Sequence, residues 1–304
     1  MKKLVVIGSS NVDVVIRVPH IPAAGETILA RDVQLCYGGK GANQAAAIAR
    51  LGGDITMIGC VGNDSFAEPL ISMLQSYGVD TSGLERVEDA PTGTAYIKVS
   101  DRGENNIVVN AGANNHVTGE MVQRYQALLE GAAYCIIQLE TPLPTLYVVA
   151  ELCQKLDIRL ILNPAPAAEL DFEQLKGTWM IVPNEMELDM LLPGDASIES
   201  KARALYQKGF THVLVTLGPQ GCLLVNEQGE TTYPSFDTFP VKDTTAAGDS
   251  FIGALAFGLS KGTSLEEAIV LANKAASITV SRAGAQPSLP TWAEMVATFG
   301  PLLP

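Results

Sequence analysis

One stretch of the sequence combines small residues with a single carboxylate at the start of a predicted helix. It runs from Asp243 to Phe251 and contains the segment Ala246-Ala247-Gly248-Asp249. A helix N-terminus carries unpaired N–H groups and a partial positive charge, and small side chains let an anion approach these groups. The pattern therefore predicts an anion site. Asp249 in the first turn is equally typical of an ordinary helix N-cap.

A second glycine-rich segment, from Gly38 to Gln44, leads into another predicted helix. It reads Gly-Gly-Lys-Gly-Ala-Asn-Gln. Glycines at a helix start let the backbone approach a ligand closely. The segment is not a Walker A loop, because Lys40 is followed by Gly41, and it does not match the dinucleotide-binding fingerprint. It indicates a site for a small polar ligand.

Polar residues also follow the predicted strands at their carboxyl ends. Asn11 and Asp13 come after the first strand, and Glu140 comes after a strand at 134–139. In open α/β sheets ligands bind beyond the carboxyl ends of the strands, so these side chains are candidates for substrate contacts. Each one alone is also typical of turn chemistry. The other members of the group are Asn163, Asn184, Glu187, Thr216 and Asp249.

The elements that position these residues alternate between short apolar runs and helical periodicity. This alternation predicts an α/β fold with a doubly wound, mostly parallel sheet flanked by helices. We expect strands at 4–7, 54–61, 134–139, 160–162, 179–182, 213–217 and 223–225, and the end of a further strand at 239–241. We expect helices from about 45 to 51 and near 65–77, 118–130, 143–155, 186–192, 197–208, 248–260, 264–282 and 291–298.

Two segments depart from this alternation and predict a small separate sheet. Residues 14–37 contain short β-like runs broken by prolines and a glycine. Residues 92–111 contain two such runs around Asp101-Arg102-Gly103, which is typical of a hairpin. We expect four or five short strands that form a lid on one domain spanning residues 1–304.

The composition excludes several classes of partner. The 304 residues are 47% hydrophobic and carry a net charge of −13, with no Lys/Arg cluster, which argues against nucleic acid. No apolar stretch reaches the roughly 18–20 residues of a membrane span, and the N-terminus lacks the apolar run of a signal peptide. The five scattered cysteines indicate reduced thiols, so we expect a cytoplasmic protein without a membrane partner.

Taken in order, the motifs resemble the ribokinase family of PfkB-type sugar kinases over essentially the whole chain. They are Asn11-x-Asp13, Gly38-Gly39-Lys40-Gly41-Ala42-Asn43, Glu140, Asn163-Pro164-Ala165-Pro166, Asn184-x-x-Glu187, Thr216-x-Gly218-x-x-Gly221 and Asp243-Thr244-x-x-x-Gly248-Asp249. The resemblance implies a ribokinase-like fold, with residues 1–304 as a single α/β kinase domain. It also implies ATP-dependent phosphorylation of the 5-hydroxyl of D-ribose.

The resemblance further implies a role for each matching position. Asp249 would be the general base, and the amides of Ala246, Ala247 and Gly248 would form an anion hole for the γ-phosphate. The sugar-binding positions would be Asn11, Asp13, Gly39, Lys40, Asn43, Glu140 and Asp249. The ATP-binding positions would be Asn184, Glu187, Thr216, Gly218, Pro219, Gln220, Gly221, Gly248 and Asn273. Glu187 would hold Mg²⁺ through water, and a K⁺ site would comprise Asp243, Thr245, Thr279, Arg282, Gly284 and Ser288.

One departure from the family pattern lies in the anion-hole segment. The broad family's Gly-Ala-Gly-Asp reads Ala246-Ala247-Gly248-Asp249 here. A methyl group at the first position is small, and ribokinases commonly carry it, so we do not interpret it as loss of function. It does weaken an assignment to more distant members of the family.

The sequence leaves two alternative functions open and also predicts an assembly state. The first alternative is a kinase for another pentose or a nucleoside, such as 2-deoxyribose. The second is a non-catalytic sugar-binding or regulatory protein, which would lack the base or the anion-hole glycine, whereas Asp249 and Gly248 are present. The lid strands carry apolar residues on both sides, and members of the family often dimerise through this lid. We therefore expect a homodimer.

Overall fold

A nine-stranded sheet forms the centre of the protein. The structure is a computed structural model that describes residues 2–302. The strand order is β13-β12-β11-β10-β9-β8-β1-β4-β5, and all pairs are parallel except β11–β12 and β12–β13. The strands are β1 (Leu4–Ile7), β4 (Ile55–Gly62), β5 (Asp80–Val87), β8 (Tyr134–Ile137), β9 (Arg159–Leu162), β10 (Met180–Ile181), β11 (His212–Thr216), β12 (Cys222–Asn226) and β13 (Gly229–Tyr233).

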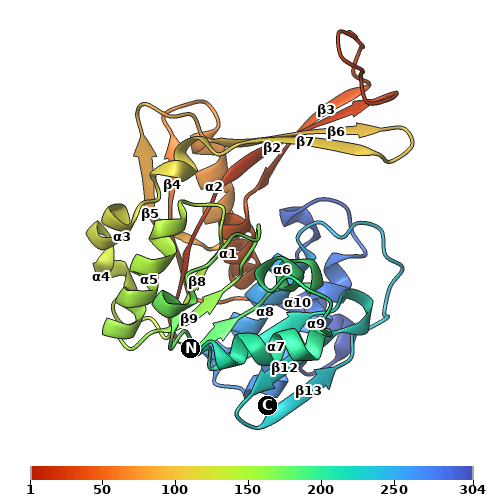
Figure 1. Cartoon of the computed structure of the whole chain (residues 1–304). Helices are drawn as coiled ribbons and strands as arrows, with labels where there is room; N and C mark the ends of the chain where they lie inside the picture. Colours follow the sequence, from red (N-terminus) through yellow and green to blue (C-terminus); the bar gives the residue numbers. More distant parts are fainter. Residues whose placement is uncertain (1, 303–304) are drawn as a thin grey trace.

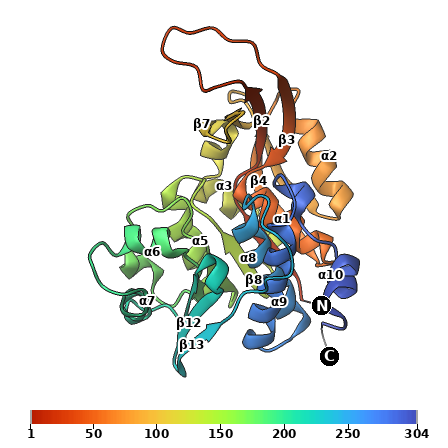
Figure 2. The same cartoon turned by 90° about the vertical axis from the view of Figure 1, so that its right-hand side faces the viewer.

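Helices cover both faces of this sheet, as Figure 1 and Figure 2 show. Side chains alternate between two buried clusters along β1, with Leu4 and Val6 in one and Val5 and Ile7 in the other. This alternation is the period of a strand buried on both faces. The first cluster includes side chains of α1 (Lys40–Arg50), α2 (Ala67–Tyr77), α8 (Ala247–Lys261), α9 (Leu265–Thr279) and α10 (Trp292–Phe299). The second includes α3 (Gly119–Arg124), α4 (Gln126–Leu129), α5 (Leu143–Lys155), α6 (Glu185–Leu191) and α7 (Ile198–Gln207). The predicted doubly wound α/β fold is confirmed.

A second, smaller sheet projects from one end of the molecule (Figure 1). Its strand order is β3-β2-β6-β7. Both β2–β3 and β6–β7 are antiparallel pairs, and β2 and β6 join them in parallel. All residues of β7 are exposed, so one edge of this sheet faces solvent. The strands are β2 (Asn11–Val18), β3 (Asp32–Gly38), β6 (Gly93–Ser100) and β7 (Asn105–Asn110).

Several predicted boundaries differ from the structure for identifiable reasons. The predicted strand end at 239–241 is wrong, since this segment forms no strand and Val241 is 66% exposed. Pro240 has no N–H for a ladder bond. The predicted helix at 118–130 is two short helices separated at Tyr125, and the β-like run from Glu26 becomes a strand only at Asp32. The strands β5 and β13 were not predicted, because both are sheet edges with many exposed polar residues.

The states of the cysteines and the lengths of the helices can be compared with what the composition predicts. All five cysteines are free thiols, as predicted, and four of them are buried. Buried thiols pack like small apolar side chains. Across residues 2–302, no helix combines the length and the apolar content needed to cross a bilayer.

Helices α1 and α8 approach each other closely, and this contact positions the catalytic candidates. The atoms of α1 nearest Gly253 belong to Ala47, Gln44 and Ile48, all of which are buried. On α8, a Cβ at Gly253 would lie only 2.5 Å from Cβ of Ala47 and 3.2 Å from the carbonyl oxygen of Gln44. Glycine at 253 therefore sets the distance between the two helices.

We predict that Gly253→Ala lowers the free energy of unfolding by about 1–3 kcal/mol, because the added methyl group overpacks the contact. Gly258→Ala is the matched control, since its Cβ would meet Cβ of Ala268 at 3.1 Å and requires a smaller shift. Urea denaturation of both variants measures the difference. Equal stability of the two variants would contradict the packing argument.

Candidate active site

Asp249 lies in the first turn of α8, where it is only 7% exposed. Its Oδ2 accepts a hydrogen bond from Nδ2 of Asn43 at 3.0 Å, and its Oδ1 accepts one from Nε2 of Gln44 at 3.0 Å. Burial raises the pKa of Asp249, against the lowering effects of the Lys40 charge and these two hydrogen bonds. The carboxylate is thus held in a fixed orientation in a poorly solvated site.

The backbone before Asp249 forms an open helix start. Ala246 is the N-cap residue, has a left-handed conformation with φ of 60°, and is not capped by a side chain. The N–H of Ala247 donates to the carbonyl of Thr244 at 3.2 Å. In residues 2–302, the N–H groups of Ala246 and Gly248 have no acceptor, and a Cβ at Gly248 would meet open space. This geometry suits an anion.

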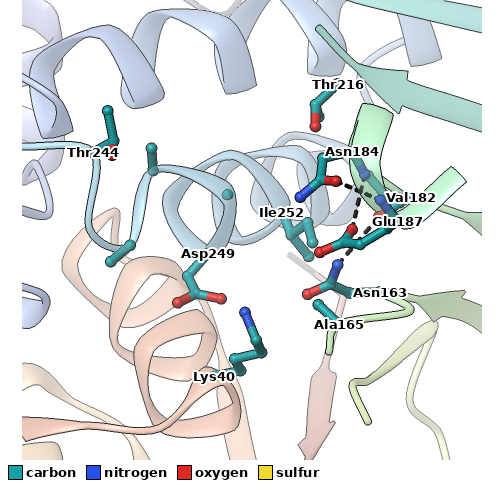
Figure 3. Close-up of a pocket in the computed structure, with 13 residues that line it drawn as sticks. Lys40, Asn163, Ala165, Val182, Asn184, Glu187, Thr216, Thr244, Asp249 and Ile252 are labelled. Atoms are coloured by element: carbon teal, nitrogen blue, oxygen red, sulfur yellow. Dashed lines mark hydrogen bonds between the residues drawn. The ribbon is translucent and has the colours of Figure 1, made fainter. Parts of the chain in front are cut away.

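A cavity of about 190 Å³ opens in front of these groups (Figure 3). Asp249 and Lys40 face one another across part of it in the close-up. Eight of the predicted site residues line this cavity. They are Lys40, Asn184, Glu187, Thr216, Ala246, Ala247, Gly248 and Asp249, and the other lining residues are Asn163, Ala165, Val182, Thr244 and Ile252.

Asn184 and Glu187 form a capping box at the start of α6. Oδ1 of Asn184 accepts from the N–H of Glu187 at 2.8 Å, and Oε2 of Glu187 accepts from the N–H of Asn184 at 2.8 Å. This reciprocal pairing stabilises the helix start. Burial raises the pKa of Glu187, whose second carboxylate oxygen remains for a ligand of the cavity it lines. The motif therefore has a structural role as well as a place in the site.

Asn11 lies at the start of β2 and not in a turn. Its Oδ1 accepts from Nδ2 of Asn114 at 2.8 Å, and Oδ1 of Asn114 accepts from the N–H of Ser10 at 2.9 Å. Asn114 is 1% exposed and lies in the 3₁₀ helix η1 (Gly112–His116). Asn114 could not be predicted from the sequence, because its only signal is an asparagine in a polar run far along the chain.

Glu140 holds the glycine-rich segment at the start of α1. Its Oε2 accepts from Oγ of Ser9 at 2.5 Å and from the N–H of Lys40 at 3.0 Å. Gly39 has φ of 86°, and a Cβ there would lie 2.8 Å from the backbone nitrogen of Asn11. Only glycine fits this close, left-handed position.

Asp13, on β2, is a half-buried acid close enough to Glu140 for the two charges to interact. Burial and the nearby Glu140 carboxylate raise the pKa of Asp13 to about 6. Two carboxylates in proximity need hydrogen-bond donors, and the hydroxyl groups of a sugar supply donors on neighbouring carbons. The electrostatics therefore favour a neutral polyhydroxyl ligand here.

Three buried polar atoms near these residues have no hydrogen-bond partner within residues 2–302. They are Oγ of Ser10, Oδ1 of Asn43 and Oε1 of Gln138. A buried polar atom without a partner costs about 1–3 kcal/mol, so such groups are normally satisfied by water or by a ligand. Asn43 is also the donor to Asp249, which puts its free acceptor beside the candidate base.

Of the predicted nucleotide-binding residues near β11 and on α9, some line the cavity and others do not. Thr216 ends β11 and lines the cavity. Gly218, Pro219 and Gln220 form the 3₁₀ helix η3 directly after it, and Gly221 follows with φ of 95°. Asn273 is buried on α9, where its Nδ2 lies 3.6 Å from Sγ of Cys222, and it does not line the cavity.

The predicted monovalent-cation residues lie around two loops behind the helix start. Oδ1 of Asp243 accepts from the N–H and the hydroxyl of Thr245 at 2.9 and 2.7 Å, and Oδ2 accepts from the N–H of Gly284 at 2.8 Å. Asp243 thereby links the loop before α8 to the loop after α9. The Arg282 side chain instead pairs with Glu294 at 2.8 Å. Thr279 and Ser288 are fully buried.

The raised pKa of Asp13 predicts a pH-dependent stability. The folded-state pKa of about 6 exceeds the ordinary value of 3.8, so the stabilising contribution of the neutral acid is present at low pH and lost as the pH rises through about 6. We expect Asp13→Asn to gain about 2–3 kcal/mol of unfolding free energy relative to the wild type between about pH 4 and pH 8. Urea denaturation across this range tests it, and a constant difference would contradict it.

Comparisons with known proteins identify the family. The chain matches the pfkB family of carbohydrate kinases over residues 1–292. It is 40% identical to a ribokinase of Bacillus subtilis, over 96% of this chain and 97% of that protein. It is 36% identical to a deoxyribokinase of Salmonella typhi, over 95% of each. The structure of Arabidopsis thaliana ribokinase complexed with ribose and ATP is similar, with a TM-score of 0.92, 31% identity and 98% of each chain covered. The chain therefore belongs to the pfkB family of carbohydrate kinases.

Proposed function

We propose that this chain is an ATP-dependent sugar kinase that converts D-ribose to D-ribose 5-phosphate, with ADP as the second product. The observation that carries the proposal is the position of Asp249, a buried carboxylate directly beside free backbone N–H groups in one cavity. A base next to an anion site is what phosphoryl transfer to a hydroxyl requires. Relatives named ribokinase at up to 40% identity support the choice of sugar.

In this proposal ribose lies among Asn11, Asp13, Gly39, Asn43 and Glu140, with Lys40 between the sugar and the phosphate groups. The 5-hydroxyl oxygen bonds to the γ-phosphorus as the bond from that phosphorus to the β-phosphate oxygen breaks. Asp249 takes the hydroxyl proton and later releases it to solvent. The free N–H groups of Ala246 and Gly248 stabilise the negative charge on the transferred group.

The residues present also fit the ions that the family resemblance implies. Glu187 keeps one carboxylate oxygen for Mg²⁺, through bridging water, and the ion would neutralise phosphate charge. For K⁺, both carboxylate oxygens of Asp243 already accept hydrogen bonds. Backbone carbonyls around Thr245, Thr279, Arg282, Gly284 and Ser288 would therefore supply the ligands, and K⁺ would order the loop that ends at Ala246. Thr216 through Gly221, with Asn273, would contact the nucleotide.

A second candidate function is phosphorylation of 2-deoxyribose or another pentose. The relative from Salmonella typhi is named a deoxyribokinase at 36% identity, close to the identities of the ribokinases. The two sugars differ by one hydroxyl. A site that hydrogen-bonds this hydroxyl discriminates strongly against its absence, so the acceptor preference decides between them. A non-catalytic role is disfavoured, because the base and the open helix start share one cavity.

The small sheet is proposed to act as a lid on the sugar side and as a dimer interface. It connects directly to Asn11 and Asp13, which lie on β2. Large apolar side chains of its strands are exposed, and a second copy would cover them. They are Val33 (54%), Leu35 (57%), Tyr96 (43%), Ile107 (52%), Val108 (57%) and Val109 (61%). The five free thiols support a location in the reducing cytoplasm.

We predict that Asp249→Asn lowers kcat with ribose by about 10³-fold, within the range for loss of a general base, while ribose binding survives. Glu266→Gln, which alters an exposed acid in the first turn of α9, is the control and keeps wild-type turnover. ATP turnover is measured with D-ribose, 2-deoxy-D-ribose, D-fructose and adenosine, each with K⁺ and with Na⁺. Wild-type turnover in Asp249→Asn would refute the assigned base.

The proposed dimer makes a separate prediction. We expect light scattering at micromolar concentration to give twice the chain mass, and the double change Leu35→Glu and Val109→Glu to give the monomer mass. Charges at these positions would be buried without partners in the interface. Glu88→Lys, an exposed charge change outside the small sheet, is the control. A monomeric wild type would refute the dimer and leave the kinase assignment intact.

A further inference from the structure

A chain of buried amide groups runs from the large sheet to Asp249. Nε2 of Gln138 donates to Oε1 of Gln44 at 2.7 Å, and Nε2 of Gln44 donates to Oδ1 of Asp249 at 3.0 Å and to Oδ1 of Asn163 at 3.1 Å. Nδ2 of Asn163 in turn donates to the carbonyl of Val182 at 3.2 Å. Gln44 and Gln138 are at most 1% exposed.

The carboxylate sets the direction of the two bonds that link Gln138 to Gln44 and Gln44 to Asp249. An ionised carboxylate only accepts hydrogen bonds, so Gln44 must turn its NH₂ group toward Asp249. Its carbonyl oxygen then faces Gln138, which must present its own NH₂ group. A reversal at Gln138 would place two acceptors against each other and would oppose the orientation of Gln44 that its bonds to Asp249 and Asn163 require.

The packing around Gln138 fixes the position of its amide, and the bond to Oε1 of Gln44 selects which end of that amide faces Gln44. A Cβ at Gly8 would lie 2.1 Å from Oε1 of Gln138, so the amide packs directly against the backbone that follows β1. Gln138 itself follows β8 and has no contact with Asp249 among the hydrogen bonds of the described residues. Its influence on the base therefore passes through Gln44.

The hydrogen bonds from Asn43 and Gln44 leave acceptor sites on the Asp249 carboxylate free for a substrate. Asn43 and Gln44 use one acceptor site on each carboxylate oxygen, and a carboxylate has about four such sites. The remaining sites can accept the proton of a substrate hydroxyl without breaking either bond. Gln44 thus fixes the carboxylate without competing with the substrate.

We infer that Gln44 and Gln138 are positioning residues for the reaction, which act as a directional amide relay that holds Asp249 as the proton acceptor. The inference rests on the proposed kinase function. It assigns a role to two residues outside the sugar, nucleotide and cation positions.

The first test compares Gln44→Met and Gln138→Met, which keep the side-chain length and remove the amide. We expect Gln44→Met to lower kcat by about 10- to 100-fold, since it removes a hydrogen bond to a charged group, with a smaller change in KM for ribose. The acid limb of the kcat–pH profile should move to higher pH. Gln138→Met should move the same limb in the same direction, and the double variant should match Gln44→Met alone.

Gln138→Glu tests the direction of the relay with almost no change of shape. The introduced carboxyl group can donate to Gln44 while it is neutral, whereas its ionised form can only accept and would oppose the orientation in which Gln44 donates to Asp249. We expect near-normal kcat at low pH and a new alkaline limb that is absent from Gln138→Met. This limb should disappear in the Gln44→Met background. An alkaline limb that persists there, or additive effects of the two methionine variants, would overturn the relay.

A readout without turnover separates this inference from the proposed function. Loss of the Gln44 bond raises the folded-state pKa of Asp249, so the fall in unfolding free energy as the pH rises above the ordinary carboxyl value of 3.8 should extend to higher pH in Gln44→Met than in the wild type. The difference should vanish when Asp249→Asn is added. If the wild type phosphorylates no sugar, the function fails while this cycle still tests the relay, and an equal pH dependence would overturn the relay alone.

Discussion

The structure of the site depends on one constraint, the satisfaction of a buried carboxylate. Asp249 sits where water is largely excluded, and an isolated charge there would be strongly unfavourable. Its donors come from α1, through Asn43 and Gln44, while Asp249 itself belongs to α8. The bonds form only if the two helices pack closely, and Gly253 allows this packing. A hydrophobic contact thus fixes the position of a polar group that a reaction requires.

The start of α8, beside Asp249, is less stable than a capped helix start, and its N–H groups are open to an anion. Ala246 adopts a left-handed conformation, which costs a residue with a Cβ about 1–2 kcal/mol. No side chain caps the helix, although capping would stabilise it by about 1 kcal/mol. Asp243 offsets part of this cost by bonding Thr245 and Gly284, which ties the loop before α8 to the loop after α9. The N–H groups remain available because the loop is held from behind.

The sequence predicted the place of the site better than the contacts within it. The polar residues after parallel strands converge because all those strands end at one edge, which is a property of topology. No individual role was predicted for Gln44, Gln138 or Asn114, because their roles depend on which way a buried amide points after helices and sheet have packed. The edge strands β5 and β13 were missed for a related reason, since exposed edges need no apolar pattern.

The distribution of charge gives a reason why the site is built for a ligand and not for maximal stability. Burial raises the pKa of Asp13, Glu187 and Asp249, so each acid is less stable as an anion than it would be in water. Glu140 adds to the repulsion at Asp13 and Asp249, whereas Lys40 opposes it at Glu187 and Asp249. Hydroxyl donors and a metal ion would relieve this imbalance without adding negative charge. The desolvation and mutual repulsion of these acids are present before any ligand binds. A ligand that relieves them therefore binds more tightly, because their removal contributes to the binding free energy.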